Sequence, residues 1–343
     1  MSPSIDDVAR LAGVSTATVS RALRGLPHVT EVTRANVLRI ATDLGYVPSR
    51  SASALATGRT RTVGLVVPAI SRWFFATLLE GAENALRAAN FDALLYSLPD
   101  DVAPRRRFDS DVLRSRVDAV LVASILFNEE EVEHLRSLDV PAVFVSVVQP
   151  GFSHVGIDDA AAATTATQHL IDLGHTTIGH VSGHSTDDDP LAPTTRRREG
   201  WRRALEASGL DASEDLDEPA DMSATGGYAS TRILLDRRPD VTAIFAASDE
   251  TAVGAMKAVR ERGLVVGRDI SVVGIDGHAL GEFFGLTTVA QPIHEQGARA
   301  AQFLLENIGA PNPEPQEFIF PTTLIQRAST GPGRRLTISR PNP

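Results

Sequence analysis

The 343-residue chain contains no cysteine and a single lysine, Lys257. The absence of cysteine excludes disulfides, thiolate catalysis, and zinc or iron–sulfur sites with cysteine ligands. Because no Gly-Lys-Ser/Thr sequence exists, a Walker phosphate-binding loop is excluded as well. No apolar run approaches the roughly 18 residues that a membrane-spanning helix needs, and residues 1–10 lack the basic start and apolar core of a signal peptide. We therefore expect a cytoplasmic protein with no membrane partner.

The net charge of −10 is unevenly distributed along the chain. Residues 1–61 contain eight Arg against four Asp and Glu, a charge of +4, so the other 282 residues carry −14. A basic head on an acidic body indicates an anionic partner that meets the head alone. Nucleic acid is the commonest partner of this kind.

Residues 1–47 show the pattern of three short helices, each preceded by a serine or threonine cap. The caps are Ser4, Ser15 and Thr30, the glycines after the first and third helices are Gly13 and Gly45, and the second and third helices are expected over 16–23 and 32–43. Cap oxygens accept the first free amide groups of a helix, and glycine readily takes the left-handed conformation that ends one. A helix, a glycine turn and a second helix predict a helix-turn-helix domain, which places the start of its second helix in the major groove.

The start of this second helix supplies the predicted DNA contacts. They are Ser15, Thr16, Ala17, Thr18, Ser20 and Arg21. Thr16 and Ala17 would face the bases; arginine can bond guanine with two hydrogen bonds, whereas hydroxyls mostly contact phosphates. The alternative is a small helical bundle with ordinary solvated arginines, and the division of charge favours DNA binding.

Residues 48–61 form a linker with little to bury except Leu55. Pro48 suits the first turn of a helix and Gly58 its end, but so few residues of Ser, Ala and Arg do not hold a helix alone in water. We expect this segment to be ordered only under some conditions. Leu55 could insert between base steps in the minor groove or pack on the surface of the body, and its local sequence leaves both readings open.

From residue 62 onward, short apolar runs alternate with amphipathic helices. The runs span 63–67, 92–97, 119–124, 142–146, 154–158, 178–183, 242–248 and 270–276. Continuous apolar runs between helices are typical of parallel sheets that are covered on both faces. The runs form two groups, about 62–160 and 162–290, which predicts an α/β fold with two doubly wound parallel-sheet subdomains.

Polar residues stand at or just after the carboxyl ends of these runs. They are Ser97, Ser124, Ser146, Asp158, Ser182, Ser248 and Asp276. Ligands of open α/β sheets bind in the crevice outside the carboxyl ends of the strands. Hydroxyls and carboxylates there suit a neutral, hydroxyl-rich ligand such as a sugar. Each residue alone is more often a turn or cap, as Ser248 could be for a helix starting near Glu250.

Two further stretches could contribute to such a crevice. The aromatic run Trp73–Phe75 follows the first strand, where an exposed ring suits a sugar or a base and a buried ring belongs to the core. The run Arg196–Arg198 stands before Gly200 and Trp201. A run of arginines is usually a solvated helix face, but one turned inward could bond two hydroxyls or a carboxylate.

The chain carries no recognisable catalytic motif. It has no G-x-S-x-G elbow, no H-E-x-x-H sequence, and no G-x-G-x-x-G after the first strand. His180 and His184 lie near Asp187–Asp189, but an ordinary polar loop explains them as well as a metal site does. We therefore expect neither an enzyme nor a bound metal or cofactor.

Six segments, in order along residues 4–330, resemble the bacterial transcription regulators of the lactose repressor (LacI/GalR) family. They are IDDVARLAGVSTATVSRALRG (5–25), the hinge from Tyr46 through Pro48 to Leu55, VGLVVPAIS (63–71), LGHTTIGHVSG (173–183), ISVVGID (270–276) and LTTVAQP (286–292). The resemblance implies a helix-turn-helix headpiece (1–47), a hinge helix (48–61) and a core like a periplasmic sugar-binding protein (62–343). It implies an N-subdomain of about 62–160 and 291–321, and a C-subdomain of about 161–290 and 322–343, joined by three crossovers.

By position, the resemblance also implies roles for individual residues. Thr16 and Ala17 match the base-reading residues, Arg21 a further groove contact, and Leu55 the hinge leucine that enters the minor groove. Arg197, Asp249 and Asp276 match effector contacts, and Phe74 lies in a stretch that often lines the pocket. With the polar strand ends and the aromatic residues, the expected effector-binding set is Ser71, Trp73, Phe74, Ser124, Ser146, Arg197, Trp201, Ser248, Asp249 and Asp276.

The chain departs from the family pattern at several of these positions. Arg72-Trp73 stands where many members have Asn-Pro, Ser146 where Asp or Asn is usual, and Ser248 where Asn is frequent. These departures leave the identity of the effector open. The tail after Ser329 lacks the leucine heptads that make some members tetrameric, so we expect a homodimer.

The sequence thus predicts a repressor of sugar-utilisation genes that a small-molecule effector controls and that binds a palindromic operator. Within the same class, the effector or corepressor could instead be a purine or nucleoside that stacks on Trp73 or Phe74. A sugar-binding component of a transporter is a further alternative, which the basic head and the missing signal peptide disfavour. A sugar-modifying enzyme needs an acid/base pair or cofactor loop that the sequence does not display.

Overall fold

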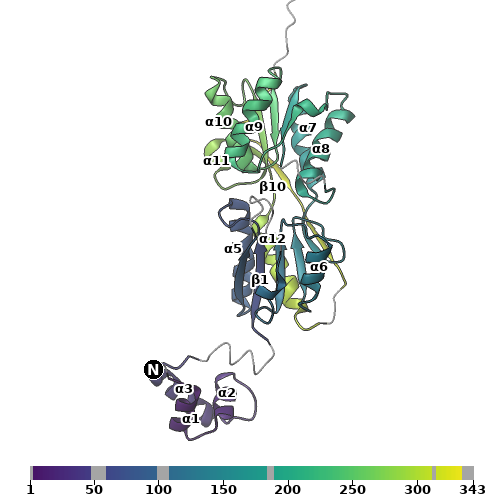
Figure 1. Cartoon of the computed structure of the whole chain (residues 1–343). Helices are drawn as coiled ribbons and strands as arrows, with labels where there is room; N and C mark the ends of the chain where they lie inside the picture. The colour runs from purple at the N-terminus through teal and green to yellow at the C-terminus, as the bar shows by residue number, and fades with distance from the viewer. Residues whose placement is uncertain (1–2, 48–58, 99–107, 184–188, 311–313, 334–343) are drawn as a thin grey trace, which may run out of the picture. The chain divides into compact units, whose positions relative to one another are not determined.

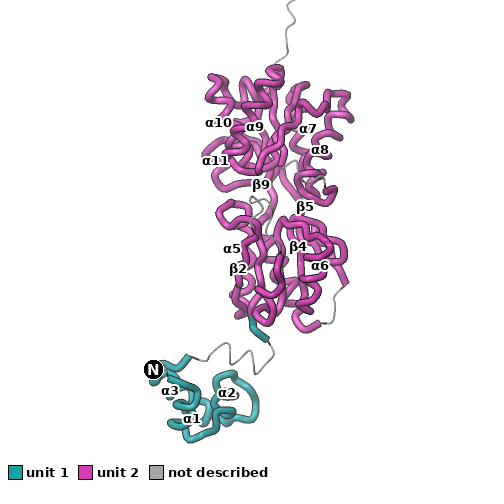
Figure 2. Tube along the Cα trace, viewed as in Figure 1, with its two compact units in different colours: residues 1–61 teal, residues 62–343 magenta. Residues whose placement is uncertain are grey.

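The computed structural model describes residues 3–47, 59–98, 108–183, 189–310 and 314–333. It divides into two compact units, Met1–Arg61 and Thr62–Pro343, which we call unit 1 and unit 2 (Figure 2). Leu55 and most of the predicted hinge lie outside the described residues, so the proposed role of Leu55 remains a prediction. Among the described residues, no helix is long and apolar enough to cross a membrane.

The described residues of unit 1 form a bundle of three helices, as predicted. They are α1 (Ile5–Ala12), α2 (Thr16–Leu23) and α3 (Glu31–Leu44). The three predicted caps are confirmed, because the side chains of Ser4, Ser15 and Thr30 each accept an amide hydrogen bond from the first turn of their helix. Gly13 and Gly45 end α1 and α3 in the left-handed conformation, which costs glycine little.

A small core and one arginine hold α2 in place within unit 1. Val8, Val19 and Val37 are fully buried and come one from each helix. Arg34 on α3 donates to the carbonyl oxygens of Ala22 (3.0 Å) and Leu26 (2.9 Å). The first bond occupies a carbonyl in the last turn of α2, where helix carbonyls lack partners within the helix, and the second occupies a carbonyl in the loop that follows. One side of α2 is thus anchored, and its other side remains on the surface.

The part of unit 2 that the structure describes contains two six-stranded sheets, which confirms the predicted fold class. The first sheet has the strand order β11-β5-β4-β3-β1-β2 with parallel neighbours throughout, and the second has the order β12-β10-β9-β8-β6-β7, parallel except for β12. The first-sheet strands are β1 (Thr62–Val67), β2 (Asp92–Ser97), β3 (Ala119–Ala123), β4 (Ala142–Val145), β5 (Ser153–Ile157) and β11 (Glu317–Phe320). The second-sheet strands are β6 (Ile178–Val181), β7 (Asp217–Glu218), β8 (Ala243–Ala246), β9 (Ser271–Asp276), β10 (Thr287–Ala290) and β12 (Thr323–Ile325).

Helices pack against both sheets. Those of the first sheet are α5 (Trp73–Ala88), α6 (Glu129–Arg136) and α12 (Ile293–Asn307). Those of the second are α7 (Asp159–Asp172), α8 (Pro193–Ala207), α9 (Ala224–Arg237) and α10 (Asp249–Glu261), and the short α11 (Gly281–Phe284) lies between β9 and β10 in the chain. Single 3₁₀ turns occur at Ser110–Val112 and Glu214–Leu216. Figure 1 shows α7 and α8 on one flank of the second sheet, and α9 and α10 on the other.

The chain passes between the two sheets three times. It leaves the first sheet after β5 and enters α7, returns after β10 into α12, and leaves again between β11 and β12. We call the layers around the first and second sheets the N-subdomain and the C-subdomain. Because each contains segments from distant parts of the chain, neither folds as one continuous stretch of sequence.

Glycines set the spacing of the three main helix pairs of unit 2, namely α5 with α12, α7 with α8, and α9 with α10. A methyl group on Gly254 of α10 would lie 2.0 Å from the carbonyl oxygen of Ala224 and 2.6 Å from the amide of Tyr228 on α9. Gly81 of α5 and Gly200 of α8 meet backbone of their partner helices just as closely. The backbones therefore touch where any larger residue would force them apart.

We expect Gly254→Ala to destabilise unit 2 by about 1–3 kcal/mol, because the added methyl group meets backbone atoms that cannot move independently. Urea denaturation followed by circular dichroism measures the loss. The control is Gly64→Ala in β1, whose methyl group would lie no closer than 3.4 Å to the side chains of Leu113 and Val117. Equal stabilities of the Gly254 variant and the control would contradict this account of the helix packing.

Candidate functional site

The exposed side of α2 carries most of the residues that the sequence predicts to contact DNA. Thr16, Ala17 and Arg21 are exposed, whereas Val19 and Ala22 on the same helix are buried against α1 and α3. Polar and small side chains therefore line the outer surface of a helix whose inner surface is fixed. This is the arrangement by which a helix enters a DNA groove.

The other predicted DNA contacts shape the start of α2. The Ser15 hydroxyl oxygen accepts the amide of Thr18 at 3.2 Å, and the two side-chain hydroxyls are hydrogen-bonded at 2.9 Å. Ser15 is exposed, and Thr18 and Ser20 are half-buried. The capping bonds hold the first turn of the helix rigid, so that its neighbouring side chains are presented in one orientation.

In unit 2, the carboxyl end of β1 lies against the carboxyl ends of C-subdomain strands. Arg72 precedes α5 and contacts Glu250 at the start of α10, and Trp73 stacks on His278, which follows β9. We call the region defined by these four residues the junction. The sequence did not single out Glu250 or His278 as functional residues, because nothing in a single chain's pattern shows which loops of two sheets will meet.

A buried cluster of charges lies directly behind the junction. The Nε atom of Arg197 donates to Asp159 at 2.8 Å, its Nη1 atom donates to the carbonyl oxygen of Ala247, and Nη1 lies 3.9 Å from Oδ1 of Asp276. Arg197 is only 5% exposed, and both aspartates are similarly buried. Of the arginine run Arg196–Arg198, the residue that turns inward is the one that the resemblance implied.

Burial shifts the ionisation of every member of this cluster. It raises the pKa of Asp276 to about 7; the Arg197 guanidinium opposes this rise and the Asp249 carboxylate adds to it. Burial also raises the pKa of Asp159 and that of Asp249. For Arg197, burial lowers the pKa, but the nearby carboxylates of Asp159 and Asp276 outweigh it and the pKa is raised. One permanent cation thus faces three carboxyl groups that hold their protons unusually tightly.

Asp276 is held in a strained position at the end of β9. Its φ is +136° and that of Gly277 is +80°, and such a conformation is costly for a residue with a side chain. Its Oδ1 atom accepts a hydrogen bond from Nε2 of Gln291 (2.8 Å), whose Oε1 in turn accepts one from Gln296 on α12 (2.9 Å). This chain of amides fixes the Asp276 carboxyl group and links it to a helix of the N-subdomain.

Ser248 caps the start of α10, and Asp249, the first residue of that helix, bonds a neighbouring loop. The Ser248 side chain accepts the amide of Thr251 (3.2 Å) and donates to the carbonyl oxygen of Met222 (3.3 Å). Asp249 is fully buried, and its Oδ2 atom accepts the amide of His278 at 2.7 Å. The capping role that the sequence allowed for Ser248 is present, and Asp249 fixes the loop that carries His278.

Four of the other strand-end residues differ in their surroundings. Ser124 and Ser146 are half-buried after β3 and β4, and both have a positive φ (52° and 68°). Ser182 is fully buried and lies within hydrogen-bonding distance of the carbonyl oxygens of Gly183 and Glu218. Asp158 is exposed and caps α7. Of these four, Ser124 and Ser146 are left as candidate ligand contacts, although no described contact joins them to the Arg197 cluster.

The predicted aromatic contacts are divided between junction and core. Trp73 is half-buried at the junction, Ser71 is exposed just before it, and Phe74 is half-buried with its ring against Phe75. Trp201 is completely buried, donates from its indole nitrogen to the carbonyl oxygen of Ile178 (3.3 Å) and belongs to the C-subdomain core. Trp201 therefore packs in the core of the C-subdomain, and its contact with an effector stays a prediction.

A second polar cluster surrounds His180, which the sequence analysis considered as a metal ligand. Its Nδ1 atom lies 2.8 Å from Asp217, which also pairs with Arg198 at 2.8 Å, and its ring stacks on Trp201 and Phe245. The ion pair between Asp217 and Arg198 anchors the edge strand β7 to α8. Among the described residues, no group of three or more His, Asp or Glu side chains could hold a metal ion; His184 and Asp187–Asp188 lie outside them.

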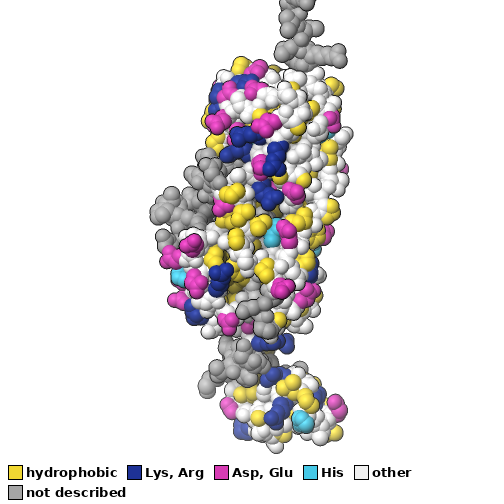
Figure 3. Space-filling view, turned by 90° about the vertical axis from the view of Figure 1, so that its right-hand side faces the viewer, with side chains coloured by type: hydrophobic (Ala, Val, Ile, Leu, Met, Phe, Trp, Pro, Cys, Tyr) yellow, Lys and Arg dark blue, Asp and Glu magenta, His cyan; other side chains and the backbone are white. Residues whose placement is uncertain are grey.

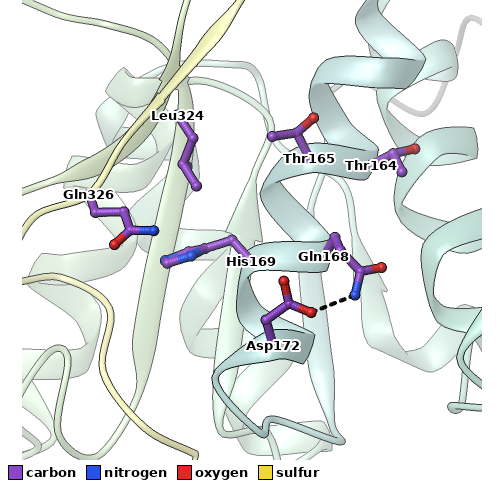
Figure 4. A pocket seen from close by; sticks show the side chains of 7 residues that line it. All are labelled: Thr164, Thr165, Gln168, His169, Asp172, Leu324 and Gln326. Atoms are coloured by element: carbon purple, nitrogen blue, oxygen red, sulfur yellow. Dashed lines mark hydrogen bonds between the residues drawn. The ribbon is translucent and has the colours of Figure 1, made fainter.

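A groove of about 350 Å³ lies elsewhere on the C-subdomain, between α7 and the segment around β12 (Figure 4). Its lining residues are Thr164, Thr165, Gln168, His169, Asp172, Leu324 and Gln326. None belongs to the predicted effector set.

On the face of the molecule seen in Figure 3, acidic and basic side chains lie interspersed rather than in large areas of one sign.

Two family models match the chain. A model of bacterial regulatory proteins of the lacI family matches residues 4–49, and a model of a periplasmic binding protein-like domain matches residues 167–330. Among characterised relatives, the HTH-type transcriptional regulator CelR of Thermobifida fusca is 34% identical over 338 residues, which cover 95% of this chain and 98% of that protein.

Solved structures show the same likeness. A complex of the transcriptional regulator CelR with cellobiose is 32% identical, with a TM-score of 0.70 and coverage of 95% of this chain and 99% of that one. The Lac repressor dimer bound to operator and the anti-inducer ONPF has a TM-score of 0.82 at 24% identity, with coverage of 96% and 100%. At that identity, the second likeness shows the fold alone.

The raised pKa of Asp276 predicts how the stability of unit 2 depends on pH. An acid whose pKa is higher in the folded chain contributes stability at low pH that is lost as pH rises from about 4 to about 7. Asp276→Asn keeps the acceptor for Gln291 and removes the titration. Between those pH values, its free energy of unfolding should fall less than that of the wild type, by on the order of 1–3 kcal/mol.

Urea denaturation at several pH values measures this difference. Asp172→Asn, at an exposed carboxylate on α7, is the matched control and should leave the slope unchanged. Parallel curves for wild type and Asp276→Asn would show that burial does not perturb this carboxyl group.

Proposed function

Because the chain belongs to the lacI family of bacterial regulatory proteins, we propose that it represses sugar-utilisation genes under the control of a small-molecule effector. In this proposal it binds a palindromic operator as a homodimer and works in the cytoplasm, where the DNA is. The observation that carries the proposal is the exposed side of α2, a fixed helix with Thr16, Ala17 and Arg21 on its outer surface.

The junction is the proposed effector site. Trp73 offers a ring face, and Asp276, Asp249 and Arg197 lie close behind it. A neutral polyhydroxyl ligand fits this chemistry, since each hydroxyl both donates and accepts and a ring face can cover a sugar. The bound cellobiose of the CelR complex supports a sugar as the ligand class. We propose Ser71, Phe74, Ser124, Ser146 and Ser248 as further, peripheral contacts.

A second effector class is favoured by one observation. The Trp73 and His278 rings lie with their centroids 4.3 Å apart and tilted by 33°, a spacing at which a flat aromatic ligand can replace one ring on the other. A purine or nucleoside is therefore the competing effector.

Transport of a sugar would not need unit 1, and we propose that the chain, like its relatives, has no enzymatic activity.

Effector control follows from linkage. A ligand that binds one arrangement of the subdomains better than another shifts the balance between them, and the coupling to DNA affinity is typically about 1–3 kcal/mol. We propose that residues 48–61 carry this coupling, with Leu55 as the residue that enters the minor groove between the two half-sites.

An exposed apolar surface on the C-subdomain supports the homodimer. Leu280, Phe283 and Phe284 lie on or beside α11, and Phe283 is 84% exposed. A cluster of large apolar side chains on the surface marks a protein contact more often than chance. A second copy of the chain is the partner that a palindromic operator requires, because a two-fold DNA site is matched by a two-fold protein.

DNA recognition is tested by selecting bound sequences from a random DNA pool with the purified chain at fixed salt. We expect an enriched palindrome, and we expect Arg21→Ala to weaken binding to it by about 1–3 kcal/mol. Arg39→Ala is the matched control, because Arg39 lies on α3 and bonds Asp43 and Asn36. The absence of any enriched sequence, with or without pooled sugars and purines, would count against the proposal.

Effector binding is tested by thermal shift with a panel of cellobiose, ribose, glucose and adenosine. A ligand at 100 times its dissociation constant adds about 2.7 kcal/mol to the stability of the protein. Asp276→Ala should remove this stabilisation and retain operator binding, whereas Asp172→Ala should preserve both. A shift that survives Asp276→Ala would place the ligand elsewhere, for example in the groove between α7 and β12.

A further inference from the structure

Arg72 spans the junction and bonds three different groups on the C-subdomain. Its Nε atom lies 3.4 Å from a carboxylate oxygen of Glu250, its Nη1 donates to the carbonyl oxygen of Asp221 (3.2 Å), and its Nη2 donates to that of Met222. Each of the three guanidinium nitrogens therefore has an acceptor on the opposite subdomain. The Arg72 and Glu250 side chains are about one-quarter exposed (27% and 25%), so water screens this pair only in part.

Trp73 reinforces this contact from the next position in the chain. Its ring lies 4.3 Å from that of His278 between centroids. Arg72 and Trp73 stand together at the start of α5, so one rigid helix end carries both contacts. They hold three separate segments of the C-subdomain: the loop before α9, the first turn of α10, and the loop after β9.

The partners of Arg72 and Trp73 are bonded directly to the proposed effector contacts. The carbonyl oxygen of Met222, which Arg72 reaches, also accepts the hydroxyl of Ser248 at 3.3 Å. The amide of His278, on which Trp73 stacks, donates to Asp249 at 2.7 Å. Met222 has a positive φ of 62°, a conformation that its surroundings must hold in place. A shift of Arg72 would therefore be felt at Ser248 and Asp249 without a contact to the effector itself.

We propose that Arg72 is a positioning residue that acts as a clasp. By bonding the two subdomains to each other, it holds the proposed effector contacts in the arrangement that binds the ligand. This rests on the junction being the effector site, as proposed above. A clasp of this kind raises the fraction of molecules in the binding-competent arrangement. The apparent dissociation constant of a ligand is its intrinsic value divided by that fraction, so removing the clasp weakens binding.

The competing interpretation is that Arg72 binds the effector directly. Glu250→Gln separates the two, because it removes the carboxylate partner and leaves the guanidinium in place. A clasp loses strength in this variant, so effector affinity falls. If Arg72 instead binds the effector directly, Glu250→Gln frees the Arg72 guanidinium from the carboxylate that competes for it, so effector affinity stays equal or rises.

The experiment measures effector affinity by calorimetry for the full chain and for Arg72→Ala, Glu250→Gln and the double variant, with the sugar or nucleoside that gives the largest thermal shift. We expect each single variant to raise the dissociation constant roughly 3- to 10-fold, and the double variant to add little to the loss in Arg72→Ala, since Arg72→Ala already removes the contact with Glu250. Arg87→Ala, on the same helix and paired within it to Glu83 and Asn84, is the control and should leave affinity unchanged. Undiminished affinity in Glu250→Gln, or additive losses in the double variant, would overturn the proposal.

A second measurement needs no effector. The chain has two tryptophans, and Trp201 is completely buried, so quenching of fluorescence by acrylamide reports on Trp73. We expect Arg72→Ala to increase the quenching and Arg87→Ala to leave it unchanged. Unchanged quenching in Arg72→Ala would overturn the clasp even if effectors bind at the junction. Increased quenching, with no panel ligand bound, would support the clasp and count against the proposed effector site.

Discussion

The buried guanidinium of Arg197 is the interaction on which the rest of unit 2 depends. It comes from α8, bonds Asp159 at the start of α7 and the end of β8 at Ala247, and lies near Asp276 at the end of β9. Buried carboxyl groups are tolerated where a cation or hydrogen bonds compensate them. Arg197 supplies the charge around which two helices and two strand ends are gathered, and it thereby fixes the surface that faces the N-subdomain.

From this cluster, hydrogen bonds lead into the other subdomain. Asp276 is bonded to Gln291 in the crossover after β10, and Gln291 is bonded to Gln296 on α12. Arg72 joins the two subdomains a second time, from the N-subdomain side. A ligand that disturbs Asp276 would therefore act on a residue already connected to both layers. This is a physical route by which binding at the junction can alter how the subdomains are arranged, as linkage requires.

Local features were predictable from the sequence where one residue or one short run of residues determines them. The caps Ser4, Ser15 and Thr30 and all eight apolar runs appear as helix starts and strands, since a capping oxygen and a continuous apolar run act within a few residues. Strands β7, β10, β11 and β12 did not stand out as apolar runs. The first has two residues, β10 buries threonines, and β11 and β12 alternate between exposed and half-buried positions. Trp201 and the Arg72–Glu250 pair were beyond sequence reasoning, because burial and contact between distant segments depend on the assembled fold.

We propose that occupancy of the junction changes the affinity of the chain for DNA. The most direct test is the dissociation constant of the full chain for its selected operator, measured at fixed salt with and without the sugar or nucleoside that thermal shift shows to be bound. We expect this dissociation constant to change by about 5- to 150-fold, the range of typical allosteric coupling. An operator affinity that stays the same at saturating ligand would contradict it, because a ligand that binds both arrangements equally shifts nothing.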